Sequence, residues 1–199
     1  GRLDEDGYLE ITDRKKDIIV NSGGDTLSPQ RVEGFLTLQP EISQAMVHGD
    51  KRPHLVGIIV PDADFARDWA EENGKSQDLA ELTGDAEFAR AIDDAVARVN
   101  ADLAADPHLK GSQIKRFLIL HKELDADDGE LTRTRKVRRK MVAEKYADLI
   151  DALYSDKDHC PIEAEVTFED GRTGTINADL RIWEAPLSDT RATQAEAAE

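Results

Sequence analysis

The 199-residue sequence contains 42 acidic and 26 basic side chains, which give a formal net charge of −16 at pH 7. This acidic excess excludes a general nucleic-acid binder, because phosphate neutralisation needs Lys and Arg in excess on at least one face. With 39% hydrophobic residues the chain can bury a core, and its single cysteine, Cys160, excludes an internal disulfide or a cysteine-rich metal site.

The first part of the sequence alternates β-prone runs with charge. Residues 8–12 and 17–21 predict two strand segments on either side of the charged run Asp13-Arg14-Lys15-Lys16. We expect the chain to bend at this charged run, in a polar turn or hinge exposed to solvent.

A loop and a helix start follow. Residues 22–25, Ser-Gly-Gly-Asp, predict a flexible connection, since glycine adopts backbone angles that other residues avoid. Ser28 and Pro29 are typical of an N-cap and a first helical turn. The short helix that they introduce carries its apolar side chains on one face, namely Val32, Phe35 and Leu36.

Three apolar runs predict buried strands. Residues 42–48 and 55–60 surround a turn at residues 49–53, which is the pattern of a β-hairpin. Residues 114–120 form a further strand of the same kind.

A helical segment separates these strands. Residues 63–105 have a helical pattern that ends at Asp106-Pro107. We interpret it as structural support, because its apolar side chains recur at steps of three and four residues. This stripe consists of Phe88, Ile92, Ala95, Val96, Val99 and Leu103.

The sign of the charge reverses after residue 130. An acidic loop at residues 123–130 runs directly into a basic segment at residues 133–140. A last amphipathic helix is expected next, and its predicted core face carries Met141, Leu149, Ile150 and Leu153.

The end of the sequence predicts a hairpin and a tail. Residues 162–183 alternate around Asp170-Gly171-Arg172, which favours a terminal β-hairpin. Beyond residue 186 the chain is rich in Ala, Thr and Glu, and we expect this stretch to be disordered.

Three segments are candidates for a functional site, and each has a simpler structural interpretation. The basic segment forms either a local anion site or a solvated helix start whose cations pair with the preceding acidic loop. Residues 13–17 suit an exposed turn. Residues 22–29 place a helix N-terminus where an anion or a narrow polar chain can enter, although an ordinary strand-to-helix connection has the same pattern.

The order and spacing of these segments resemble a known family. Residues 1–17, which include Gly-Tyr-Leu-Glu-Ile-Thr-Asp-Arg-Lys-Lys-Asp, resemble the hinge region of the adenylate-forming superfamily. Residues 22–33, Ser-Gly-Gly-Asp-Thr-Leu-Ser-Pro-Gln-Arg-Val-Glu, are similar to the loop and helix that follow the hinge in its acyl-CoA ligases. Residues 129–139 are similar to the late motif of the family, Leu-Thr-x-Thr-x-Lys-x-x-Arg.

The resemblance, which extends from residue 1 to about residue 154, implies a role for each matching position. Lys136 occupies the place of the catalytic lysine, which would reach the substrate carboxylate and the α-phosphate during adenylation. Arg14 would lie by the nucleotide, and Lys16 matches the hinge whose backbone torsions change when the domain rotates. The loop of Ser22, Gly23 and Gly24 would then replace the lysine and help to line the coenzyme A tunnel.

The late motif also departs from the family pattern. Arg133 and Arg135 stand where many relatives have Pro and Leu, so neighbouring arginines could share the anion-binding role. The absence of the Pro-Lys and Gly-Lys pattern of short-chain, aryl and luciferase-type relatives, together with the helical segment at 63–105, favours the long-chain branch.

The resemblance therefore implies the C-terminal domain of an AMP-forming long-chain fatty acid–CoA ligase. We expect an α+β fold with a small mixed sheet flanked by helices, a helical insertion and a C-terminal β-hairpin. The expected organisation is a mobile lid at residues 1–154, an appended hairpin at 155–185 and a disordered tail at 186–199. The sequence opens without Met, and we expect a fragment that is inactive without its N-terminal adenylation domain.

We expect the full-length enzyme to use ATP, coenzyme A and Mg²⁺ as cofactors and a fatty acid as its substrate. We expect the fragment alone to bind none of the cofactors. The five scattered histidines match no metal spacing. No apolar run approaches the roughly 18 to 20 residues that cross a bilayer. The single cysteine fits a reducing compartment, so we expect a cytoplasmic protein, with peripheral membrane association of the full enzyme left open. Two alternatives remain: a stand-alone binding module that has lost catalysis, and an interaction module that docks through its terminal hairpin.

Overall fold

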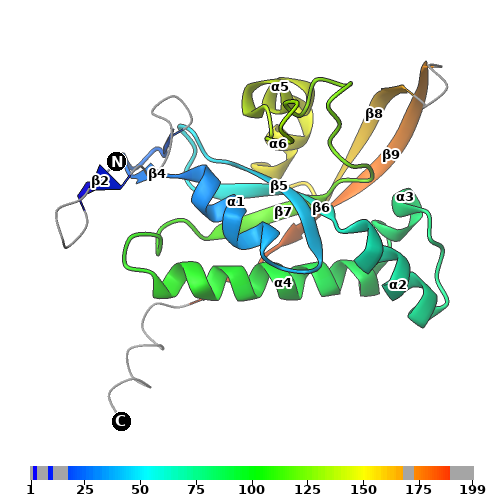
Figure 1. Ribbon diagram of the computed structural model, residues 1–199, viewed down its shortest axis with the longest axis horizontal. Helices are drawn as coiled ribbons and strands as arrows, with labels where there is room; N and C mark the ends of the chain where they lie inside the picture. The colour runs from blue at the N-terminus through cyan, green and yellow to red at the C-terminus, as the bar shows by residue number, and fades with distance from the viewer. Residues whose placement is uncertain (1, 4–8, 11–17, 168–172, 189–199) are drawn as a thin grey trace, which may run out of the picture.

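The computed structural model describes residues 2–3, 9–10, 18–167 and 173–188, with side chains described for residues 18–162 and 179–188. Its centre is a mixed five-stranded sheet with the strand order β5-β6-β7-β9-β8 (Figure 1). The β6–β7 pair is parallel, and the other three neighbouring pairs are antiparallel. The strands are β5 (Ile42–His48), β6 (Leu55–Pro61), β7 (Ile114–Ile119), β8 (His159–Thr167) and β9 (Thr173–Glu184).

Helices cover both faces of this sheet (Figure 1). On one face, buried side chains of four helices share a hydrophobic cluster with β5, β6 and β7. These helices are α1 (Pro29–Thr37), α2 (Ala63–Asn73), α3 (Leu79–Leu82) and α4 (Ala86–Ala105). On the other face, α5 (Arg139–Lys145) and α6 (Ala147–Leu153) enclose a second cluster with the sheet. The α+β prediction of a mixed sheet flanked by helices is confirmed.

Two small antiparallel ribbons precede α1. In the first, β1 (Arg2–Leu3) pairs with β2 (Leu9–Glu10), and in the second, β3 (Ile19–Val20) pairs with β4 (Thr26–Leu27). Both predicted strand segments therefore contain a strand. The charged run between them, including Arg14 and Lys16, lies outside the described residues.

The predictions for α1, for the β5–β6 hairpin and for the helical segment at residues 63–105 are confirmed. Pro29 opens α1, whose Val32 and Leu36 are fully buried, and β5 and β6 form the expected hairpin. The helical segment consists of three helices, each begun by an aspartate that accepts hydrogen bonds from the first backbone amides. The predicted stripe of α4 is completely buried.

The segment after residue 138 differs from its prediction. Two short helices meet at Tyr146, whose φ of −107° and ψ of 29° interrupt the helical backbone. The prediction that Met141 faces the core is wrong, because its side chain is 41% exposed. Val142 of α5 and Tyr146 at the break face the core instead, while Leu149, Ile150 and Leu153 of α6 are buried as expected.

The C-terminal hairpin continues the central sheet. Strand β8 pairs along its whole length with residues 173–181 of β9, and residues 182–184 of β9 pair with β7, with Phe117 opposite Trp183. The amide of Asn100 on α4 donates to the carbonyl of Pro186 across 3.0 Å, and Gln113 exchanges two hydrogen bonds with the backbone of Ser188. Residues 186–188, expected in the tail, are thus bound to the domain, whereas residues 189–199 lie outside the described part.

Candidate functional site

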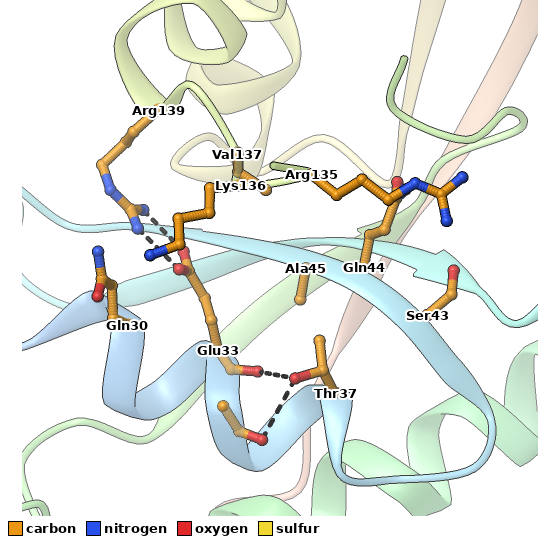
Figure 2. Close-up of a pocket in the computed structure, with 11 residues that line it drawn as sticks. Gln30, Glu33, Thr37, Ser43, Gln44, Ala45, Arg135, Lys136, Val137 and Arg139 are labelled. Atoms are coloured by element: carbon orange, nitrogen blue, oxygen red, sulfur yellow. Dashed lines mark hydrogen bonds and ion pairs between the residues drawn. The ribbon is translucent and has the colours of Figure 1, made fainter. Parts of the chain in front are cut away.

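A pocket of about 290 Å³ lies between α1, the edge strand β5 and residues 135–139 (Figure 2). Lys136 and Arg135 line it from the basic segment, and Glu33 lines it from α1. The structure therefore places the predicted catalytic lysine in a concave surface that also contains a carboxylate.

The backbone holds Lys136 in a compact loop. Leu131 and Val137 form an isolated antiparallel bridge, and the amide of Thr132 donates to the carbonyl of Lys136 across 2.8 Å. The amide of Lys136 in turn donates to the Thr132 hydroxyl across 3.1 Å. Arg135 adopts a φ of 57°, an uncommon value for a side chain with a Cβ. The Lys136 loop, residues 131–138, is thus a closed turn that fixes where the lysine side chain begins.

A buried carboxylate anchors the start of the Lys136 loop. Glu130 is only 1% exposed, and it accepts from the Tyr146 hydroxyl at 2.7 Å, Lys145 at 2.8 Å, Lys122 at 3.1 Å and the amide of Asp125 at 2.9 Å. Its backbone carbonyl also accepts from the amide of Arg138 across 2.8 Å. Both ends of the loop are therefore attached to one buried residue.

The charges around Glu130 stabilise its ionised form. Burial raises the pKa of Glu130, but the hydrogen bonds from Lys145, Tyr146 and the Asp125 amide, together with the Lys122 charge, outweigh burial and lower it. The pKa of Lys145 is raised because its contacts with Glu130 and Asp128 outweigh its own burial. The acidic loop therefore carries ionised side chains that hold it against α5.

A second ion pair anchors the end of the loop. Arg139, the first residue of α5, donates to both carboxylate oxygens of Glu33 at 2.7 Å each and to the carbonyl of Val47 at 2.9 Å. The Glu33 carboxylate also accepts from the Val47 amide at 2.9 Å. The pair thus ties α1, the edge of β5 and α5 together (Figure 2).

The ion pairs of the acidic loop bear on one part of the structural interpretation of the basic segment, the expected pairing of its cations with that loop. The acids Asp128 and Glu130 are bound to Lys122 and Lys145, which lie outside that segment. Within the described side chains, Arg139 and Lys140 account for the salt bridges of residues 133–140. Lys136 is exposed and forms none, so the cations are not neutralised by the preceding acidic loop.

The other predicted loop is built around Asn21. Its side-chain oxygen accepts from the amides of Gly23 and Asp25 at 2.9 Å each, and Gly24 adopts a φ of 89°. The amide of Ser22 donates to the carbonyl of Arg52 at 3.0 Å, which attaches the loop to the β5–β6 turn. Ser22, Gly23 and Gly24 are exposed at the β3–β4 turn and do not line the Lys136 pocket.

Sequence reasoning missed Glu33 and the structural role of Arg139. Both residues stand inside the segments that carry the resemblance, but 106 positions separate them and no local pattern pairs them. Glu33 is half-buried, and carboxylates withdrawn from water are nearly always paired, but this burial becomes visible only in the structure.

Three of the five histidines, His48, His54 and His121, are buried or half-buried, whereas His108 and His159 are exposed. Burial is the main cause that lowers the pKa values of His48, His54 and His121. In the part of the chain that the structure describes, no cluster of three or more His, Cys, Asp or Glu side chains could hold a metal ion. None of the helices there combines the length and apolar character that a membrane crossing requires.

A protein-family model, described as the AMP-binding enzyme C-terminal domain, matches residues 16–158. The chain therefore belongs to the AMP-binding enzyme C-terminal domain family.

Two relatives place the chain within the superfamily. It is 40% identical over 157 residues to the long-chain-fatty-acid–CoA ligase FadD15 of Mycobacterium tuberculosis, covering 78% of this chain and 25% of that protein. It is 33% identical over 175 residues to the long-chain-fatty-acid–CoA ligase ACSBG1 of Rattus norvegicus, covering 79% and 24% respectively. The chain thus spans about a quarter of the length of these relatives.

Solved structures share the fold. The adenylation domain of the carboxylate reductase of Mycobacterium chelonae superposes with a TM-score of 0.57 at 21% identity, over 77% of this chain and 24% of that one. The corresponding domain of a carboxylic acid reductase from Segniliparus rugosus, in complex with AMP and a carboxylic acid, gives 0.55 at 20% identity, over 76% and 24%.

Proposed function

We propose that this chain is the mobile catalytic lid of an AMP-forming long-chain fatty acid–CoA ligase. In the first half-reaction a carboxylate attacks ATP to give an acyl-adenylate and pyrophosphate, and in the second coenzyme A displaces AMP to give the thioester. The observation that carries the proposal is an exposed Lys136 that forms no salt bridge with the described side chains, on a loop held at both ends by ion pairs of Glu130 and Arg139. The names of the relatives support a long-chain fatty acid as the substrate.

Lys136 acts in the first half-reaction. Negative charge spreads over the α-phosphate and the carboxylate as they react, and a fixed cation stabilises that charge more than a mobile one. The compact Lys136 loop supplies this fixed position, since its backbone is closed by Thr132 and its ends by Glu130. In the same reaction Arg14 lies by the nucleotide.

The second half-reaction uses a different loop of the same domain. Rotation about Lys16 removes Lys136 from the active site and brings in Ser22, Gly23 and Gly24. The absence of side chains at the two glycines permits close approach of the backbone to the narrow pantetheine arm of coenzyme A. The two loops occupy separate parts of the domain, since Ser22, Gly23 and Gly24 do not line the Lys136 pocket, and this supports an exchange of the loops by rotation.

The complete reaction needs parts outside this chain. An N-terminal adenylation domain of the same polypeptide supplies the nucleotide pocket, and Mg²⁺ enters with ATP. A long-chain fatty acid is sparingly soluble in water, so the full enzyme takes it from a membrane surface by peripheral association.

Pyrophosphate release tests the proposal. The purified 199-residue chain, given ATP, Mg²⁺ and a fatty acid, is expected to release none at an enzymatic rate, because one lysine cannot replace a nucleotide pocket. The same domain joined to its adenylation domain is expected to release pyrophosphate and then form the thioester. An active isolated chain would contradict the lid model, and an inactive joined protein would favour a non-catalytic binding module.

A further inference from the structure

We propose that Arg139 is a positioning residue that keeps the carboxylate of Glu33 from capturing Lys136. The inference rests on the proposed role of Lys136 and adds a second requirement to it: the catalytic ammonium must stay free of the acid that shares its pocket. Arg139 meets that requirement by binding the acid itself.

The carboxylate in question stands at the pocket wall. Glu33 and Lys136 line the same pocket, and Figure 2 shows the Lys136 side chain extending over α1 toward the space in which Glu33 and Gln30 lie. The Glu33 side chain is 13% exposed, so its charge is only partly screened by water. If Arg139 did not bind the Glu33 carboxylate, that carboxylate would attract the nearest mobile cation.

Arg139 binds both oxygens of that carboxylate. Its two terminal nitrogens each donate to a different Glu33 oxygen at 2.7 Å, which is the two-pronged geometry that suits a guanidinium and a carboxylate. Val47 completes the arrangement, because its amide donates to Glu33 and its carbonyl accepts from Arg139. Edge strand β5 thereby fixes the pair in one orientation.

The competing cation is left unpaired. Lys136 makes no salt bridge with the described side chains, although a glutamate lies in its pocket and its flexible side chain can move. A lysine bound to Glu33 would have to break that contact before it met a substrate anion, and this would weaken stabilisation of the transition state. The bidentate arginine therefore favours the catalytically useful arrangement.

Chemical labelling of Lys136 tests this inference without any substrate of the enzyme. The chain is acetylated at fixed pH, and modification of each lysine is followed by peptide mass spectrometry. Arg139→Ala is expected to slow labelling of Lys136 by about tenfold, because an adjacent carboxylate favours the unreactive protonated amine. The double variant Arg139→Ala with Glu33→Gln is expected to restore the original rate.

Three controls make the result specific. Lys140, exposed and adjacent to the mutated residue, reports any general loosening of the segment. Glu33→Gln alone removes the capturing charge and is expected to leave the labelling of Lys136 close to its original rate. Arg139→Gln replaces Arg139→Ala if the alanine variant does not fold, since glutamine keeps a donor for Val47 but loses the charge.

Two outcomes would overturn the inference: unchanged or faster labelling of Lys136 in folded Arg139→Ala, or a double variant as slow as the single one. The same variants in the joined enzyme separate this result from the proposed function. In one outcome, labelling of Lys136 follows the expected pattern but the rate of adenylation is the same in every variant. That result would support the binding of Lys136 by Glu33 and refute the catalytic role of Lys136.

Discussion

The hydroxyl of Tyr146 donates a 2.7 Å hydrogen bond to the carboxylate of Glu130, and both residues are about 1% exposed. This contact joins the break between α5 and α6 to the start of the Lys136 loop. The carboxylate of Glu130 also accepts from Lys122 and Lys145, so neutralising it weakens several charge-assisted hydrogen bonds at once, although both lysines keep Asp128 as a partner.

Glu130→Gln is therefore expected to lower the free energy of unfolding by about 3 kcal/mol, because several hydrogen bonds to a buried charged group weaken together. Tyr146→Phe removes one hydrogen bond to a charged group and is expected to cost about 2 kcal/mol. Urea denaturation followed by circular dichroism measures both. Equal stabilities of Glu130→Gln and the unaltered domain would show that the buried network contributes nothing net.

Acid should weaken the same network. The folded pKa values of Glu130 and Asp128 lie below those of the unfolded chain, so folding is stabilised above the unfolded pKa and loses that stabilisation as the pH falls through the folded values. His48, His54 and His121, whose folded pKa values are lowered, add to the loss as the pH falls below about 6.5. Melting temperature is expected to decline from that pH downward, and Glu130→Gln should flatten the part of the decline below pH 4.5.

Lys136→Ala should affect one half-reaction. In the joined enzyme we expect single-turnover adenylation to slow by about 10²–10³, while thioester formation from supplied acyl-adenylate is nearly spared. Arg133→Ala is the matched control, because Arg133 is exposed and forms no salt bridge with the described side chains. Similar losses in both variants would indicate a diffuse basic surface. Arg139 does not serve as a control, since it is bound to Glu33.

Gly24→Ala should affect the opposite half-reaction. Gly24 has a φ of 89°, and an L-residue in such a conformation costs about 1 kcal/mol. Gly74, at the end of α2, has a φ of 63° and open space around it, so Gly74→Ala carries a comparable strain far from the loop. Thioester formation should slow in Gly24→Ala alone. Equal rates of thioester formation in the two variants would show that the Gly24 loop does not contact coenzyme A.

Lys16→Pro tests the hinge. Proline fixes φ near about −65° and so excludes one of the two backbone states that rotation needs. We expect one half-reaction of the joined enzyme to lose far more activity than the other, as measured by separate single-turnover assays. Equal losses in adenylation and thioester formation would argue against a hinge at this position.

Local sequence patterns predicted the helices and strands more completely than they predicted which of these elements pack or pair with one another. Pro29 and the apolar positions of α1 specify a helix through capping and periodicity, both of which act within a few residues. The α4 stripe is equally local. The pairing of β9 with β7 has no such signal, because sheet neighbours depend on the complete arrangement of strands.

The candidate site shows the same division. A motif with fixed spacing identified Lys136, whereas its supports come from distant segments: Tyr146 from the break between helices, and Glu33 from α1. Met141 is exposed because Val142, the next residue, takes the core face: the buried positions Val142, Tyr146, Leu149 and Leu153 follow steps of three and four residues, and Met141 lies outside that stripe. Periodicity alone does not reveal where a helix is interrupted.

The strand order has a consequence for biosynthesis. Strand β7 lies between β6, which precedes it in the chain, and β9, which the ribosome makes much later. Until residue 184 emerges, one edge of β7 presents unpaired backbone groups, and a message that stops short of β9 would leave that edge permanently available to other nascent chains. Truncated products of this domain are therefore expected to require chaperones or proteolysis, even though every residue of the Lys136 loop would already have been translated.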